Sequence, residues 1–341
     1  MLDLISIGDV TEDVFVQVGD AAKLACKDKN HCVLEFEYPT KIGIAKVDKL
    51  IGGNAGNMAI GSARLGLKSA LYSEVGNDTQ GIRLKQSLID NKVSTKYFYL
   101  KKGEKTNYSV VLYFKGDRTI LVHHEKRAYK FPKIEKSKWI YLTSMGTGSQ
   151  KIFKPLLTYL KKTNAKLGFN PGTHQIKLGT KKILPIIKRS NVMFINTQET
   201  QKILNTKTND FRKLTKGLYD LGTKIAVVTD GPNGAYCYDG NNYWYCPIYD
   251  VKILERTGCG DAFSTGFLSA LANNKPVEQA MVWASLNSAG VVQQVGPQNG
   301  LIKLTTLKKI LKANPQYKAR KFTSSQVKTN KIYKPKKYKS F

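Results

Sequence analysis

Short apolar runs alternate with segments of helical periodicity along most of this chain. The apolar runs lie at residues 2–10, 68–76, 138–146, 165–172, 192–199 and 224–231. Segments whose apolar residues recur at helical spacing lie between several of these runs, at residues 55–66, 78–91, 149–163 and 208–222. Strands and helices that alternate in this way predict βαβ units, and therefore a mostly parallel sheet with helices on both faces.

Two regions, residues 14–50 and 96–125, break this alternation. Their apolar and aromatic residues alternate with polar ones, which predicts strands, and no long helical segment separates those strands. Two β-rich regions of this kind can pair into a small sheet beside the main body, and a small sheet flanking a ligand face is a natural lid. Near the C-terminal end the pattern predicts two further helices, at residues 262–274 and 276–296.

Length and composition fit one large globular α/β domain with an appendage, since the chain has 341 residues of which 41% are hydrophobic. No window reaches the roughly 18 apolar residues that a membrane span needs, and the acidic N-terminal stretch does not resemble a signal peptide. Five cysteines, an odd number in a long chain, favour reduced thiols and a cytoplasmic location. Cys26 and Cys32 lie on either side of His31, so zinc binding is an alternative for this segment, although no second pair at finger spacing follows.

The net charge is +30, which favours anionic partners such as nucleotides, sugar phosphates or nucleic acids. The excess is densest in a basic C-terminal tail, residues 316–341, which contains no acidic residue. Such a tail is usually a solvated extension, and docking onto the body of the protein is the alternative. Aromatic residues interleave with its lysines, which suits weak contact with RNA or DNA. They are Tyr317, Phe322, Tyr333, Tyr338 and Phe341.

Two stretches carry the residues best suited to chemistry. Residues 52–66 read GGNAGNMAIGSARLG, where Gly53 lets a backbone approach a ligand closely and Asn57 offers donors and acceptors at a helix start. Asparagines there suit a neutral polyol, and helix capping is the plain alternative. Residues 255–263 read ERTGCGDAF. Backbone N–H groups at this helix start can hold an anion while Asp261 accepts a proton, and the alternative is a loop in which Asp261 caps the helix.

Together these stretches resemble the two signature regions of the PfkB, or ribokinase-like, family of carbohydrate kinases. Their order and separation also fit, and the resemblance extends from about residue 2 to residue 300. It implies an α/β fold, a ribokinase-like three-layer α/β/α sandwich with a mostly parallel central sheet and a small β-sheet lid. The kinase domain would span residues 1–315, with lid segments at about 14–50 and 96–125.

The resemblance also implies ATP-dependent phosphorylation of a sugar hydroxyl, with Mg²⁺. Asp261 matches the family's catalytic base, and the residues that match its anion hole are Gly258, Cys259 and Gly260. Asp13 matches the acid that holds sugar hydroxyls. The residues that match its helpers in sugar binding are Gly53 and Asn57.

On the nucleotide side the resemblance assigns a further set of residues. Asn196 and Glu199 match an Asn-x-x-Glu pair that organises magnesium and phosphate, with Glu199 acting on the metal through water. The nucleotide-side loop is matched by Thr229, Gly231 and Gly234. Asn287 falls at an adenine-side position, and Asn170 lies where a nucleotide-facing Asn is common.

The chain departs from the family at Glu255-Arg256-Thr257, where many members have Asp-Thr-Thr. The aspartate and the second threonine there help to bind a monovalent cation, so the resemblance leaves potassium activation open for this chain. Arg256 either offers a fixed cation near the phosphates or pairs with an acid.

The lid is expected to select the acceptor, and the sequence leaves its chemistry open. Basic lid residues either bind the phosphate of a sugar phosphate or form a solvated rim; they are Arg118, His123, His124, Lys126 and Arg127. Aromatic lid residues either stack on the base of a nucleoside or form the core of the sheet; they are Phe36, Tyr38, Tyr108 and Tyr113.

A free sugar is the preferred acceptor, and a nucleoside or a sugar phosphate is the alternative. A non-catalytic, nucleic-acid-binding relative is less favoured because Asp261 and its neighbouring glycines are retained. The resemblance also implies a homodimer that forms through the lid sheets.

Overall fold

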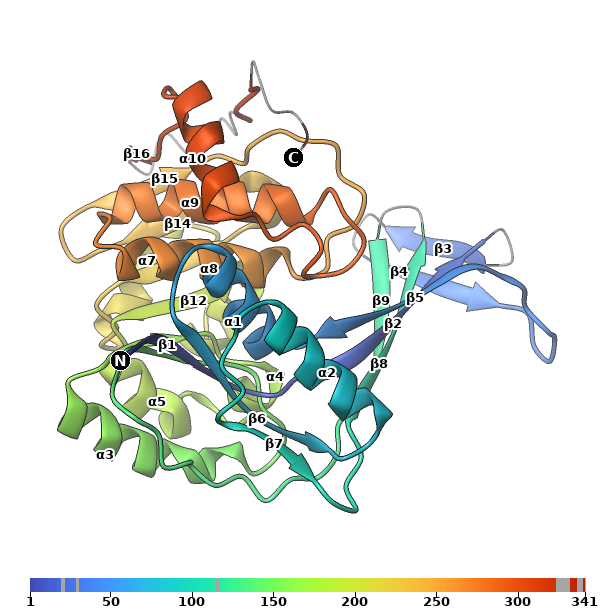
Figure 1. Ribbon diagram of the computed structural model, residues 1–341. Coiled ribbons are helices and arrows are strands. Elements are labelled where there is room, and N and C mark those ends of the chain that lie inside the picture. Colours follow the sequence, from blue (N-terminus) through green and yellow to red (C-terminus); the bar gives the residue numbers. More distant parts are fainter. Residues whose placement is uncertain (20–21, 29–30, 115–116, 323–331, 336–339, 341) are drawn as a thin grey trace.

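The computed structural model describes residues 1–19, 22–28, 31–114, 117–322, 332–335 and 340 (Figure 1). A ten-stranded sheet forms its centre, in the order β16-β15-β14-β13-β12-β11-β10-β1-β6-β7. In chain order its strands are β1 (Leu2–Ile7), β6 (Ser69–Gly76), β7 (Phe98–Lys101), β10 (Ser137–Leu142), β11 (Lys166–Phe169), β12 (Val192–Asn196), β13 (Ala226–Thr229), β14 (Ala235–Tyr238), β15 (Tyr243–Cys246) and β16 (Arg320–Lys321). From β7 to β13 all neighbours pair in parallel, and the β13-to-β16 edge is antiparallel. The predicted mostly parallel sheet is confirmed.

Helices cover both faces of this sheet, because its strands send alternate side chains to opposite sides. Ile5 and Ile140 belong to one apolar core, whereas Leu4 and Trp139 belong to another. The first core is closed by α3 (Phe153–Thr163), α5 (Thr180–Arg189), α6 (Thr197–Leu204) and α7 (Phe211–Asp220). The opposite face carries α1 (Asn54–Arg64), α2 (Thr79–Asp90), α8 (Cys259–Ala272), α9 (Val277–Val291) and α10 (Leu304–Ala313). The fold is therefore the expected three-layer sandwich (Figure 1).

Most helices of the outer layers bury one stripe of side chains, whereas α1 and α8 are buried more completely. In α7, Phe211, Leu214 and Leu218 are buried at spacings of three and four residues, which is the pattern of an amphipathic helix. In α8 every residue from 262 to 270 is buried, consistent with a sequence that is apolar on all sides. Shorter helical segments are α4 (Thr173–Lys177), η1 (Ser149–Ile152) and η2 (Gly231–Asn233).

A smaller sheet projects from the main body and forms the lid (Figure 1). Its order is β5-β2-β8-β9, from β2 (Thr11–Val18), β5 (Ile44–Gly52), β8 (Asn107–Phe114) and β9 (Asp117–His123). A separate hairpin, β3 (Ala22–Asp28) with β4 (His31–Phe36), extends it. The pairing of the two β-rich regions is confirmed, because β2 of the first runs parallel to β8 of the second. The lid does not begin at residue 96, however, since β7 pairs with β6 in the main sheet.

The cysteines correct one expectation. Cys26 and Cys32 form a disulfide that joins β3 to β4, so reduced thiols were the wrong prediction for this pair. Two sulfurs bonded to each other cannot act as thiolate ligands, which removes the zinc alternative for this segment. Cys237, Cys246 and Cys259 are free thiols.

The described residues lack two features that would bear on function. They contain no cluster of three or more His, Cys, Asp and Glu side chains placed to hold a metal ion. None of their helices has the length and apolar character that crossing a membrane requires.

The described part of the basic tail packs on the body of the protein. Strand β16 adds to the edge of β15, and the side chains of Tyr317 and Phe322 are buried. The ring of Tyr333 lies 4.7 Å from that of Tyr317. Buried rings cannot stack on nucleic-acid bases, so Tyr317 and Phe322 do not serve the nucleic-acid hypothesis. Tyr338 and Phe341 lie outside the described residues.

Candidate active site

The two signature stretches meet through a direct hydrogen bond. Asn57 lies on the second turn of α1, and Asp261 lies on the first turn of α8. The Asn57 side chain donates from Nδ2 to Asp261 Oδ2 at 2.8 Å, although the two residues are 204 positions apart. The juxtaposition follows from the fold, because α1 packs against α8 on the same face of the main sheet. The predicted base and the predicted sugar-binding stretch therefore share one site.

Asp261 has a carboxyl group adapted to accept a proton near neutral pH. Burial raises its pKa to about 6, the charge of Glu199 acts in the same direction, and the Asn57 hydrogen bond acts against both. A carboxyl with this pKa is mostly ionised at pH 7. It is also more basic than an exposed aspartate, so it can take a proton that an acceptor hydroxyl releases.

The start of α8 has the geometry expected of an anion-binding turn. Gly258 caps the helix with a φ of 78°, and a Cβ there would lie 2.3 Å from the Pro297 side chain, so only glycine fits. At Gly260, no atom of the described chain beyond its neighbours lies within 4 Å of the place a Cβ would occupy. N–H groups on a first turn, including those of Gly260 and Asp261, have no acceptor within the helix. They are available to the oxygens of an anionic ligand.

Asp13 is a buried carboxyl group with an unsatisfied oxygen. Its Oδ1 is buried and has no hydrogen-bond partner among the described residues. The Oδ2 atom lies against Gly52, where a Cβ would come within 1.8 Å of it. Burial raises the pKa of Asp13 to about 7, the hydroxyls of Ser109 and Thr11 act against this rise, and the charge of Asp261 adds to it. A ligand hydroxyl would supply the missing donor, which fits the predicted sugar-binding acid.

Gly53 allows the chain to turn from the lid into α1. It caps that helix with a φ of 89°, and a Cβ there would lie 2.6 Å from the backbone of Asp9 and Val10. This close packing of backbone on backbone accounts for a glycine at this position.

Asn196 and Glu199 form the cap of α6. Asn196 Oδ1 accepts the N–H of Glu199 at 2.9 Å, and Glu199 Oε2 accepts the N–H of Asn196 at 3.3 Å. The two side chains therefore form a capping box. Burial also raises the pKa of Glu199, and its charge is felt at Asp261. A single carboxylate with spare oxygens fits a Mg²⁺ ion held mainly by phosphates and water.

A cleft of ≈ 180 Å³ lies beside the start of α8. Sequence-predicted residues on its wall are Thr229, Gly231, Gly234, Cys259 and Gly260. Its apolar wall includes Ile248, Tyr249, Val251, Ile253 and Val292, which suits the flat face of an adenine ring. Arg256 also lines this cleft and is in none of the ion pairs found among the described residues. That favours a fixed cation near the phosphates over pairing with an acid.

Two predicted nucleotide-side residues face elsewhere. Asn287 is fully buried; it donates to the backbone oxygen of Ala262 at 2.8 Å and accepts the N–H of Ile302 at 3.1 Å. Its neighbour Ser288 lines the cleft instead. Asn170 donates to the backbone oxygen of Phe194 at 2.8 Å and is absent from the cleft wall. Sequence position alone could not show that neighbouring residues on α9 point in opposite directions.

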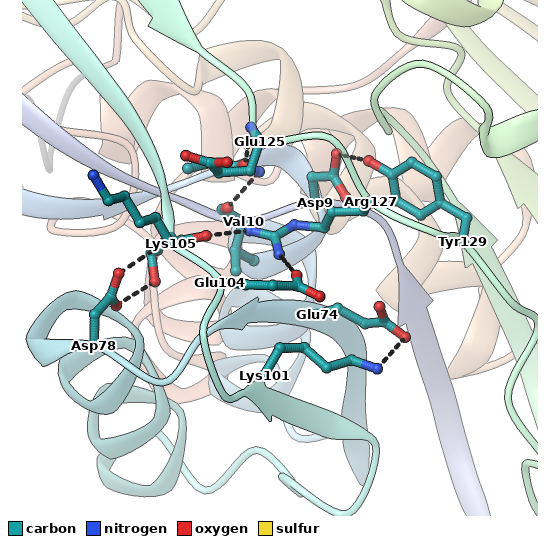
Figure 2. A network of polar contacts seen from close by, with 12 residues as sticks. Asp9, Val10, Glu74, Asp78, Lys101, Glu104, Lys105, Glu125, Arg127 and Tyr129 are labelled. Atoms are coloured by element: carbon teal, nitrogen blue, oxygen red, sulfur yellow. Dashed lines mark hydrogen bonds and ion pairs between the residues drawn. The ribbon is translucent and has the colours of Figure 1, made fainter.

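Buried polar contacts anchor the base of the lid (Figure 2). Arg127 is buried and donates to Glu104 at 2.6 Å and to the backbone oxygen of Lys105 at 2.7 Å. Asp9, at the end of β1, accepts the hydroxyl of Tyr129 at 2.6 Å. Arg127 is therefore neither a solvated rim residue nor free to bind a phosphate, and its two partners tie the segment after β9 to the loop before β8.

The other basic lid residues differ in their surroundings. His123 pairs with Glu125 at 3.1 Å and Lys126 is exposed, which fits a solvated rim. The His124 ring lies 5.8 Å from the ring of His174. Partial burial of the ring lowers the pKa of His124, although the residue as a whole is exposed.

Arg118 connects the lid to the start of α8. Its Nε lies 3.7 Å from Glu255 Oε1, and Glu255 is almost fully buried. The same carboxyl oxygen accepts the N–H and the hydroxyl of Thr257, at 2.6 Å and 2.5 Å. Glu255, where the chain departs from the family pattern, thus organises the turn before Gly258 and lies beside Arg118 of the lid.

The lid aromatics do not form a sheet core. Phe36, Tyr38 and Tyr108 are exposed, and Tyr113 donates to Gln17 at 3.2 Å. None of the four lines the cleft beside α8.

Comparison with known proteins decides the family. The sequence model of the pfkB family of carbohydrate kinases matches residues 16–304. The chain belongs to this family. An uncharacterized sugar kinase of Archaeoglobus fulgidus is 25% identical over 252 residues, which are 71% of this chain and 98% of that protein. A nucleoside kinase of Methanocaldococcus jannaschii is 24% identical over 298 residues, which are 83% of this chain and 94% of that protein.

Solved structures of pfkB-family relatives share the fold. A putative ribokinase II from E. coli in complex with ATP and Mg²⁺ superposes with a TM-score of 0.75 at 16% identity. The match covers 92% of this pfkB-family chain and 99% of that one. The family and its kinase relatives support a phosphotransferase, and the solved structure supports the fold.

Proposed function

We propose that the protein transfers the γ-phosphoryl group of ATP to a hydroxyl group of a sugar. The observation that supports this most directly is the pairing of two carboxyl groups in one site. Asp261 lies at a helix start suited to phosphate and has a raised pKa, while Asp13 has an unsatisfied oxygen suited to a hydroxyl. Each group performs a different task on the same acceptor.

In the proposed reaction the acceptor oxygen attacks the γ-phosphorus, the bond to the bridging oxygen breaks, and ADP leaves. Asp13 orients the acceptor hydroxyl, and Asp261 takes its proton as the new bond forms. The N–H groups at the start of α8 and the side chain of Arg256 stabilise charge on the phosphate oxygens. A Mg²⁺ ion, organised by Glu199 through water, would neutralise phosphate charge.

Nucleoside and sugar-phosphate acceptors remain the second candidates. The nucleoside kinase relative favours the first of these. The sugar phosphate is less favoured on this lid, because the buried Arg127 is already paired with Glu104. A free sugar requires neither a base-stacking surface nor a phosphate-binding cation.

An acceptor screen tests the proposal. Purified protein, ATP and Mg²⁺ are incubated with panels of sugars, sugar phosphates and nucleosides, and ADP formation is measured. We expect turnover with at least one free sugar that exceeds turnover with any nucleoside. ATP binding without turnover on any panel would contradict the sugar-kinase proposal, and absence of ATP binding would contradict a kinase altogether.

We further propose that the protein forms a homodimer through its lid. Apolar side chains are exposed on this sheet, namely Ile44, Val47, Ile120, Leu121 and Val122. Exposed apolar strands of this kind are protected when they pair or pack against another chain.

Activity is expected to be independent of potassium, because Arg118 places a cation beside the buried carboxylate of Glu255. Exchanging KCl for tetramethylammonium chloride should leave the rate within about twofold. Arg118→Gln should lower kcat/KM for ATP by about 10-fold, since a buried carboxylate left without its cation is destabilising near the phosphate site.

Lys126→Gln is the matched control, because Lys126 is an exposed cation of the same lid segment. Strong potassium activation of the wild-type protein would contradict the assignment to Arg118.

A further inference from the structure

A chain of hydrogen bonds continues from Asp261 through Asn57 to Gln298. Gln298 Nε2 donates to Asn57 Oδ1 at 2.9 Å, and Asn57 Nδ2 donates to Asp261 Oδ2 at 2.8 Å. Asn57 and Gln298 are both buried, with 2% and 9% of their surfaces exposed. Water therefore has little access to either amide, and each polar atom depends on its protein partner.

The Asn57 amide can face Asp261 with either of two ends that are nearly equal in size. Only the NH₂ end donates a hydrogen bond, and the carbonyl end would repel a carboxylate. The donor from Gln298 occupies the carbonyl oxygen and so fixes which end faces Asp261. Flipping the amide would lose both hydrogen bonds and bring Asn57 Oδ1 against Asp261 Oδ2.

The backbone at Gln298 is anchored by hydrogen bonds to both neighbouring segments. Its backbone oxygen accepts Arg64 Nη1 at 2.6 Å and the N–H of Leu301 at 3.2 Å. The same guanidinium donates from Nε to Asn91 at 3.0 Å. Arg64 thus joins the end of α1 to the loop between α9 and α10, the two segments that carry Asn57 and Gln298.

We infer that Gln298 is a positioning residue for the catalytic base: by fixing the Asn57 amide it keeps a hydrogen-bond donor on Asp261. The catalytic part of this inference rests on the proposed function. The orientation that Gln298 gives to the Asn57 amide does not depend on it. No motif in the sequence marks Gln298, because its role depends on a contact with a residue 241 positions away.

Other charged and titratable groups also act on Asp261 or respond to it, and the test must hold them constant. They are Glu199 on α6, Asp13 on β2, Cys259 on α8 and Tyr141 on β10. Gln298 is neutral and none of these groups is bonded to it in the described structure. Its substitution by a neutral residue therefore changes only the donor to Asn57.

The test is a direct titration of the Asp261 carboxyl. Aspartate labelled with ¹³C at the carboxyl carbon reports each group by NMR, and the signal that disappears in Asp261→Asn is assigned to Asp261. In Gln298→Glu the new carboxylate accepts from Asn57 Nδ2 and turns the Asn57 oxygen toward Asp261. The pKa of Asp261 should then rise by about one to two pH units, because the hydrogen bond from Asn57 is lost and a second negative charge lies nearby.

Gln298→Leu supplies a second, uncharged variant. It removes the donor without adding charge, so the pKa of Asp261 should rise by a smaller amount, about half to one pH unit. Asn299→Leu is the matched control, because Asn299 is the exposed neighbour in the same loop and its side chain donates to the Val295 backbone rather than to Asn57. The double variant Gln298→Leu/Asn57→Leu should show the same pKa of Asp261 as Asn57→Leu alone.

An unchanged Asp261 titration in folded Gln298→Glu and Gln298→Leu would overturn the inference. Only an uncharged variant separates the lost donor from the added charge, so Gln298→Met takes the place of Gln298→Leu if the latter fails to fold. With an active acceptor, the acid limb of kcat/KM should move upward with the same variants, whereas a purely structural effect would lower the rate equally at every pH. If the wild-type protein transfers no phosphoryl group, the proposed function fails, and the titration still decides the role of Gln298.

Discussion

Replacing Asp261 with asparagine is expected to lower kcat for phosphoryl transfer by about two to four orders of magnitude, the range that general-base catalysis contributes. Asparagine keeps the size of the side chain, but its amide cannot take the proton of the acceptor hydroxyl. The KM for ATP should change little, because the N–H groups at the start of α8 remain. Initial rates of ADP formation at saturating acceptor measure the effect.

Asp90→Asn is a suitable control for Asp261→Asn, since Asp90 is exposed and accepts a hydrogen bond from the side chain of Gln86 on the same helix. It should retain the wild-type rate. In the wild-type protein the rate should also fall as the pH decreases through about 6, because Asp261 is protonated there and cannot act as a base. A rate that stays within tenfold in Asp261→Asn would remove this residue from the mechanism.

The main sheet could be predicted from the sequence because parallel strands buried on both faces are continuous apolar runs. Every such run became a strand, and the helical periods between them became α1, α2, α3 and α7. The antiparallel hairpin of β14 and β15 was missed. Its two strands have four residues each and are rich in tyrosine, so they lack the longer aliphatic runs from which the parallel strands were predicted.

The site could be predicted only as far as its residues lie in local motifs. Gly258, Gly260 and Asp261 are close in sequence, and their helix start follows from local rules. The Arg118–Glu255 pair and the Asn57–Gln298 hydrogen bond join residues far apart in the chain. Their formation depends on how the lid and the α9–α10 loop pack, which no local pattern specifies. For the same reason the Cys26–Cys32 disulfide required the pairing of β3 with β4 to be known.

Asp13→Asn is expected to weaken acceptor use and to stabilise the free protein. The pKa of Asp13 is raised from 3.8 to about 7, so the folded state holds the neutral form more readily than the unfolded state does. The contribution of Asp13 to the free energy of unfolding is therefore fully present below pH 3.8, and it is lost as the pH rises toward 7. Asparagine is neutral at every pH. At pH 8 the free energy of unfolding of the variant should therefore exceed that of the wild-type protein by roughly 2–4 kcal/mol.

Thermal unfolding of both proteins at pH 4 and pH 8 measures this difference, which should be near zero at pH 4. In the Asp13→Asn variant, kcat/KM for the acceptor should fall by about 10- to 100-fold, because an amide oxygen accepts a hydrogen bond from a hydroxyl more weakly than a carboxylate does. A variant that is less stable than the wild-type protein at pH 8 would show that Asp13 supports the fold rather than the acceptor.

The charge of Asp261 provides a further check on Asp13→Asn, since it is one cause of the raised pKa of Asp13. In an Asp261→Asn background that repulsion is absent, so Asp13→Asn should stabilise the protein less than it does in the wild-type background. Equal stabilisation in both backgrounds would mean that burial alone sets the pKa of Asp13. A smaller effect would mean that the two carboxylates oppose each other in the free site, and that an acceptor hydroxyl donating to Asp13 relieves part of this opposition when it binds.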